Sequence, residues 1–116
     1  MADRPHERRR EARVKALTFV DVGEFSDDGV LTLLTIGRTL DLSHDGMRLE
    51  LSHGVSKGTI LTLDLELGEA IIQFHGRVRS SKPVEWGGNR FEMGIEFTDI
   101  LPEQQELLDA FIARRN

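Results

Sequence analysis

Apolar and polar side chains alternate with a period of two through most of this chain. The alternation is strict at residues 47–51, 61–67, 72–78 and 91–97. Successive side chains of a β-strand point to opposite faces, so the pattern predicts strands with one buried and one solvated face. Stretches at about 14–22 and 30–41 are rich in Val, Leu, Thr and Ile and are typical of strands as well.

Clusters of turn-forming residues separate these six predicted strands, at 26–29, 44–46, 53–58, 68–69 and 87–89. Short antiparallel strands at this spacing favour a closed or nearly closed barrel, because closure removes exposed sheet edges. The lone tryptophan, Trp86, lies in the last of these loops, and we expect it to pack over an end of the barrel.

The final segment changes to a helical period, and a helix is predicted over about 102–114. Pro102 suits a first helical position, and Arg114 and Arg115 suit the negative C-terminal end. A helix this short is marginal alone, so its apolar stripe should pack on the barrel. The stripe consists of Leu107, Leu108, Phe111 and Ile112.

Charge is distributed unevenly along the 116 residues, whose net charge is −5. Residues 1–15 carry six bases and three acids, a net of +3, which leaves −8 on the other 101 residues. A basic arm on an acidic body favours a local anion site over a surface that coats nucleic acid. We therefore divide the chain into an arginine-rich arm, 1–13, expected to be flexible until a ligand binds, and a barrel with its helix, 14–116.

Other features narrow the class of protein. The chain has no cysteine, which excludes disulfides and thiolate metal sites. Its four histidines lack metal-ligand spacing, and no nucleophile or paired-carboxylate arrangement indicates an enzyme. The absence of a long apolar run argues against membrane insertion, and a cytoplasmic location is expected.

Two short motifs carry the chemistry. Arg9 and Arg13 form an RxxxR spacing just ahead of the first predicted strand, and Asp41, Ser43 and Gly46 form a DxSxxG between two strands. Together, in this order on a pattern of six strands and a helix, they resemble the paired signature of the PilZ family. The GRV at 76–78, the GIEF at 94–97 and the LPEQQELLDAFI at 101–112 are also typical of that family.

The resemblance implies a mainly β fold, a six-stranded split barrel with a C-terminal helix, and a receptor for cyclic di-GMP (c-di-GMP) with no enzymatic activity and no other cofactor. Arg9 and Arg13 would clasp phosphates and guanine edges. Arg8 and Arg10 adjoin the motif, and such neighbours often hold a second, stacked ligand molecule in the family. The arm would fold over the ligand and so signal to a protein partner in motility, biofilm or related regulation.

The residue chemistry fits this ligand independently. A guanidinium can fork two hydrogen bonds to a phosphate or to a guanine edge and can stack on a base. Asp41 offers acceptors to the ring N–H and amino group of guanine, a donor pair that adenine lacks. Ser43 supplies a short hydroxyl. Gly46 is expected to allow a positive φ in the turn and a close approach of the ligand.

Plainer interpretations exist for each feature. The arginines alone are typical of a solvated tail, and Asp41, Ser43 and Gly46 alone are typical of ordinary turn chemistry. Arg77 and Arg79 alternate with core positions and are expected at the surface, with the alternative that one of them faces the ligand. An alternative for the chain as a whole is a protein-interaction adaptor that has the PilZ fold and does not depend on the nucleotide. Binding of RNA or single-stranded DNA is disfavoured by the acidic body and the absence of tyrosine.

Overall fold

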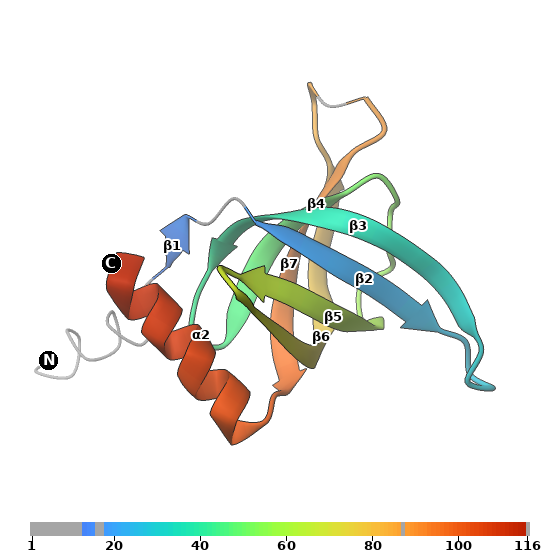
Figure 1. The fold of residues 1–116 in the computed structure, drawn as a ribbon. Coiled ribbons are helices and arrows are strands. Elements are labelled where there is room, and N and C mark those ends of the chain that lie inside the picture. The colour runs from blue at the N-terminus through green and yellow to red at the C-terminus, as the bar shows by residue number, and fades with distance from the viewer. Residues whose placement is uncertain (1–12, 16–17, 87, 116) are drawn as a thin grey trace, which may run out of the picture.

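A computed structural model describes residues 13–15, 18–86 and 88–115 of the chain. Seven strands and one helix lie within these ranges (Figure 1). They are β1 (Val14–Lys15), β2 (Phe19–Phe25), β3 (Leu31–Leu42), β4 (Gly46–Leu51), β5 (Ile60–Leu67), β6 (Ala70–Pro83), β7 (Phe91–Asp99) and α2 (Pro102–Arg115).

The strands form one antiparallel sheet that closes on itself. Their order is β1-β3-β2-β5-β6-β7-β4, and a further pairing of β3 with β4 completes the barrel. The predicted six-stranded antiparallel barrel with a C-terminal helix is therefore confirmed. The first predicted strand, 14–22, consists of two pieces, because β1 pairs with the end of β3 through Val14 and Leu42, whereas β2 pairs with β3 from Phe19 onward.

The apolar members of each alternating stretch fill the barrel. Leu63 and Leu65 of β5 lie across from Val22 and Val20 of β2, and all four are fully buried. Gly76 interrupts the alternating buried side chains of β6 because a Cβ there would lie 2.4 Å from a methyl carbon of Ile95. The two-residue period thus arises from one interior that the strands share.

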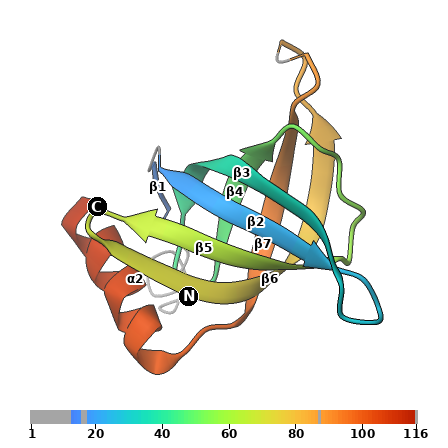
Figure 2. The ribbon, with the colours of Figure 1, turned by 45° about the vertical axis from the view of Figure 1, so that its right-hand side comes forward.

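The helix α2 lies against the end of the barrel that also holds β1 and the β3–β4 turn (Figures 1 and 2). Leu108, Phe111 and Ile112 are buried, as predicted, and Leu107 is nearly half exposed at the margin of the stripe. No described helix is both long enough and apolar enough to cross a membrane.

The prediction for Trp86 is wrong, because 93% of this residue is exposed. The strands β6 and β7 stay paired as far as Pro83 and Phe91, and Figure 1 shows the connection between them projecting away from the barrel. The tryptophan lies in this connection and therefore cannot reach the core.

Candidate ligand-binding site

Three strands bring the two halves of the sequence motif together. Asp41 is the penultimate residue of β3, and β1 pairs with β3 through Lys15 and Asp41. Arg13 immediately precedes β1, so this pairing places its side chain at Asp41 although 28 residues separate them. On the other side of β3, the β4 register sets Arg48 directly across from Asp41.

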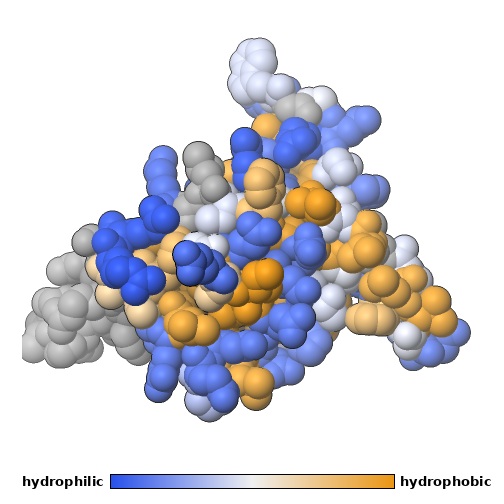
Figure 3. All heavy atoms as spheres, in the orientation of Figure 1, coloured by the Kyte–Doolittle hydropathy of each residue, from blue (hydrophilic) through white to orange (hydrophobic). Residues whose placement is uncertain are grey.

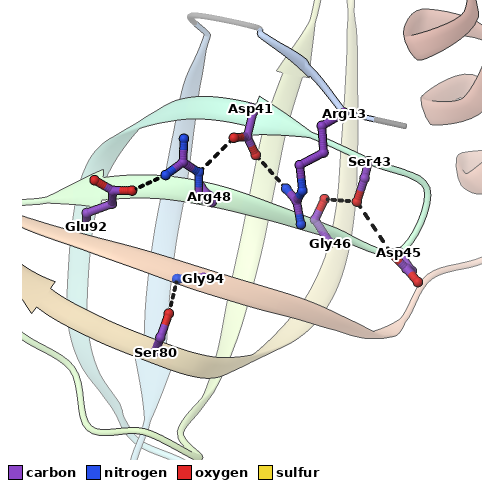
Figure 4. Close-up of polar contacts among 9 residues, drawn as sticks. All are labelled: Arg13, Asp41, Ser43, Asp45, Gly46, Arg48, Ser80, Glu92 and Gly94. Carbon is purple, nitrogen blue, oxygen red and sulfur yellow. Dashed lines mark hydrogen bonds and ion pairs between the residues drawn. The ribbon is translucent and has the colours of Figure 1, made fainter. Parts of the chain in front are cut away.

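The Asp41 carboxylate is held by two guanidinium groups, one on each oxygen. Nη1 of Arg13 lies 2.5 Å from Oδ1, and Nε of Arg48 donates to Oδ2 at 2.7 Å (Figure 4). Arg48 also donates through Nη1 to Glu92 of β7. Its hydrogen bond to Asp41 and the negative charge of Asp41, with a smaller contribution from Glu92, raise the pKa of Arg48.

Asp41 itself is only 7% exposed, whereas both arginines keep about half of their side-chain surface in solvent. A buried carboxylate needs such partners, because removing a charge from water is costly unless opposite charges and hydrogen bonds compensate. The arginines themselves can be rehydrated at little cost. The cluster therefore consists of a buried anion with two half-exposed cations around it.

The turn after β3 is closed by its own polar groups. The backbone N–H and the hydroxyl of Ser43 both donate to the carbonyl of Gly46, at 2.8 and 3.1 Å, and the hydroxyl lies 3.4 Å from a carboxylate oxygen of Asp45. The carbonyl of Asp45 accepts from the N–H of Phe97 at 3.0 Å. Ser43 is thus buried and shapes the turn, as the plainer interpretation of the motif expects.

The expectation of a positive φ at Gly46 is wrong, because positive φ values occur elsewhere in the described residues and not at this glycine. Gly46 is instead the first residue of β4, paired with Glu96 of β7. A Cβ at this position would lie 2.6 Å from the carbonyl oxygen of Ile95. Glycine is needed here because the β7 backbone approaches too closely for any side chain.

An open hollow of about 280 Å³ adjoins the Asp41 cluster. Its lining includes Arg13, Asp45, Gly46 and Gly94, together with Arg79 of β6 and Glu96 of β7. Arg79 and Glu96 form an ion pair at 3.3 Å, and both are more than half exposed. The hollow therefore presents two exposed guanidinium groups, from Arg13 and Arg79, beside a glycine-lined backbone.

The structure places four of the predicted residues together: Arg13, Asp41, Ser43 and Gly46 (Figure 4). The other predicted residues, Arg8, Arg9 and Arg10, lie outside the described residues. Two basic residues of the site were missed or set aside from the sequence, Arg48 and Arg79. Arg48 lies between two buried residues and Arg79 follows one, and only the pairing of β4 and β6 with other strands brings them to the site.

The helix also contacts the turn between β3 and β4. Nδ1 of His44 lies 2.8 Å from a carboxylate oxygen of Asp109, and the side-chain amide of Gln105 donates to the His44 carbonyl at 3.0 Å. Both partners are on α2. Among the described side chains, no group of three His, Asp or Glu residues is arranged to bind a metal ion.

Comparisons with known proteins agree with this fold. A family model described as "PilZ domain" matches residues 7–114. The fold resembles the Bacillus subtilis inhibitor of motility MotI/DgrA, with a TM-score of 0.71 and 24% identity, over 92% of this chain and 51% of that one. This chain therefore spans about half the length of that relative. No curated protein matches this chain.

Two further similar structures are named as holding the nucleotide. One is the PilZ domain of Escherichia coli YcgR with c-di-GMP, with 20% identity and a TM-score of 0.68, over 93% of this chain and 91% of that one. The other is the K. pneumonia MrkH–c-di-GMP complex, with 16% identity and a TM-score of 0.71, over 91% and 51%. At these identities the likeness is one of fold. Because the family model spans nearly the whole chain, this protein belongs to the PilZ domain family.

Proposed function

We propose that this chain is a non-enzymatic receptor domain for c-di-GMP, with the ligand bound at the Asp41 end of the β3–β4 pair. The observation that carries the proposal is the buried Asp41 carboxylate, which is bridged by Arg13 and Arg48 beside an open hollow. Arg13 and Asp41 belong to the two halves of the sequence motif, so the motif and the site coincide. The choice of ligand is supported by the family to which the chain belongs and by two similar structures that are named as containing c-di-GMP.

Each side chain has a distinct task in this proposal. The phosphates of the ligand draw the half-exposed guanidinium of Arg13 away from Oδ1 of Asp41, because a phosphate accepts its bidentate fork. Oδ1 then accepts the ring N–H and amino donors of a guanine. Arg48 stays on Oδ2 and keeps the carboxylate oriented. Ser43 keeps the turn in shape, and Gly46 leaves room beside it.

The arm would complete the site. Arg8, Arg9 and Arg10 precede Arg13 in the chain and would reach the phosphates or stack on the bases. We propose that the arm closes over the ligand and that the altered surface is recognised by a protein partner. Protection of the arm from an arginine-specific protease at saturating ligand would support this step, and cleavage at an unchanged rate would contradict it.

Isothermal titration calorimetry tests the proposal directly. We expect c-di-GMP to bind the wild-type chain, and Arg13→Ala and Asp41→Ala each to abolish measurable binding. Cyclic di-AMP is the matched ligand control, because it has the same phosphates without the guanine donor pair. Arg77→Ala is the matched protein control, because this exposed arginine lies on β6 and does not line the hollow. Absence of heat with wild type, with an unshifted melting temperature in excess ligand, would contradict the proposal and favour a nucleotide-independent adaptor.

A further inference from the structure

A second open hollow is lined by Arg79, which also lines the hollow of the candidate site. Its volume is about 540 Å³, and it lies between the end of β6 and the loop that joins β4 to β5. The loop is held to β6 next to Arg79 by backbone hydrogen bonds of Val78 with Gly58 and Thr59, at 2.7 and 2.9 Å. Because β4, β7 and β6 are neighbours in the sheet, the two hollows lie next to each other on the barrel.

The lining of the second hollow is polar and positively charged. It includes the cations Lys57 and Arg79 and the hydroxyl groups of Ser56, Ser80 and Ser81, and none of its described lining residues is acidic. The chain after residue 15, in contrast, carries a net charge of −8. Much of the exposed apolar surface lies instead over the β2–β3 hairpin (Figure 3). The second hollow is therefore suited to an anionic group with several oxygen acceptors, such as a phosphate.

A β-bulge sets the direction of Arg79. The pairing of β6 with β7 passes from Val78 and Ile95 to Ser80 and Gly94, which leaves Arg79 without a partner in the ladder. Bulges of this kind redirect a side chain and are frequent next to functional sites. As a result, Arg79 and Ser80 are both exposed although they are consecutive. The bulge thus places two polar side chains at the surface where strict alternation would place one.

Both of these side chains keep hydrogen-bonding capacity for a ligand. Nη1 of Arg79 lies 3.3 Å from Oε1 of Glu96, and both side chains are more than half exposed, so exchanging this partner costs little. The Ser80 hydroxyl accepts from the N–H of Gly94 at 3.2 Å (Figure 4), which leaves its own proton to be donated. The bulge therefore supplies a replaceable guanidinium and a hydroxyl donor side by side.

We propose that the second hollow binds a phosphate of c-di-GMP through Arg79 and Lys57. This inference rests on the proposed function and extends its site beyond the Asp41 cluster. The nucleotide carries two phosphates on opposite sides of a closed ring. The hollow beside Asp41, at about 280 Å³, lies below the range of about 300–1,000 Å³ that is typical of small-molecule sites, so the ligand has to extend beyond it. Arg79 marks the side on which the cationic lining continues.

Calorimetry of the full chain with c-di-GMP tests this phosphate site. We expect Arg79→Ala to weaken binding about tenfold or more and Lys57→Ala about fivefold, because each removes a charge-assisted contact with a phosphate. Arg77→Ala and Lys82→Ala are the matched controls, since both residues are exposed on β6 and neither lines a hollow of the site. A stoichiometry that falls from two to one in both test variants would assign the phosphate to a second nucleotide molecule, and an unchanged stoichiometry to the first.

The result that overturns this inference differs from the result that overturns the proposed function. Wild-type binding, with Arg79→Ala and Lys57→Ala as tight as their controls, would overturn the phosphate site and leave the receptor function in place. A loss in Arg79→Ala alone would confine the ligand to the hollow beside Asp41 and would also overturn it. Absence of binding by the wild type would overturn both proposals.

Glu96→Gln gives an independent test with an effect in the opposite direction. This change should strengthen c-di-GMP binding about threefold, because Arg79 loses the carboxylate that competes with the phosphate. Unchanged or weaker binding by Glu96→Gln would show that the ligand does not take Arg79 from Glu96, and would overturn the assignment of Arg79 to the phosphate.

Discussion

The β3–β4 strand pair carries a nearly buried carboxylate at each end. The two carboxylates differ in where their arginine partners lie in the chain. Asp41 and Glu50 are 7% and 8% exposed, and each contacts two arginines. The cross-strand register pairs Asp41 with Arg48 at one end and Glu50 with Arg38 at the other. Two carboxylates, each contacted by two arginines, thus lie on one ladder.

The arginines of the two clusters come from different parts of the chain. Glu50 is held through Oε1 by Arg38 of β3, at 3.0 Å, and by Arg90, at 2.8 Å, which immediately precedes β7. Both of these arginines are anchored next to barrel strands. Arg13, in contrast, is the last residue of the arginine-rich arm and precedes the two-residue β1. We infer that the Glu50 cluster stabilises the barrel. The Asp41 cluster, in contrast, contains one arginine, Arg13, that can leave the carboxylate and bind a ligand.

The largest expected effect is on ligand affinity. Asp41→Asn replaces one acceptor oxygen with a donor and should weaken c-di-GMP binding roughly 1,000-fold, in the range found when one partner of a buried charged contact is removed. Glu50→Gln, the matched change at the other end, should leave affinity close to that of wild type. Calorimetry of both variants measures this difference. Equal losses of affinity would remove the functional distinction between the clusters.

The reverse pattern is expected for the free energy of unfolding. Replacing both Arg38 and Arg90 by Ala leaves Glu50 buried without a cation, which should destabilise the fold by about 2–3 kcal/mol. Arg13→Ala should cost less than about 1 kcal/mol, because Arg13 is half exposed and Arg48 still neutralises Asp41. Urea unfolding of the variants gives both values. A larger loss in Arg13→Ala than in the double variant would contradict the assignment.

Much of the fold follows from the sequence because one physical pattern repeats. Alternation of buried and exposed residues predicts β5 with little error, since Leu61, Leu63 and Leu65 face a single shared interior. The break between β1 and β2 was missed because both pieces have the same strand-forming composition. Trp86 was misplaced because residue type does not tell how far a loop projects from the core.

The site was predictable only where its residues belong to a motif. Arg13 and Asp41 were found because their order in the chain is itself a signal. Arg48 carries no such signal, because its role arises from the register that sets it across from Asp41. The reason expected for glycine at position 46 was wrong, since the contact that requires it comes from the β7 backbone, 49 residues away in the chain at Ile95.

A smaller effect is expected at Arg48, which we regard as a positioning residue. Arg48→Gln removes the positive charge that contacts Oδ2 of Asp41. This change should weaken c-di-GMP binding about tenfold. The preference of this variant for c-di-GMP over cyclic di-AMP should also fall, because an Asp41 carboxylate that is not held in one orientation discriminates less well between guanine and adenine. Arg48→Lys should recover part of the affinity, since it restores charge without the guanidinium fork. An unchanged selectivity in Arg48→Gln would show that Asp41 does not depend on Arg48.

The smallest effect is expected at the contact between the β3–β4 turn and α2. Asp109→Ala removes the partner of His44, and both side chains are roughly half exposed. Stability should change by less than about 0.5 kcal/mol, as is usual for exposed pairs. Thermal unfolding measures this, and a loss several times larger would show that the helix stabilises the Asp41 end far more than exposed contacts normally do.

A titration of the isotope-labelled wild type with c-di-GMP, followed by amide NMR, tests most directly whether the two ends of the β3–β4 pair differ in function. The account predicts saturable shifts for Asp41 to Arg48 and for the side chain of Arg13. Amides next to Glu50 and Arg90 should keep their positions. Shifts centred on the Glu50 end, or no shifts at saturating nucleotide, would contradict the assignment of Asp41 as the ligand-binding carboxylate.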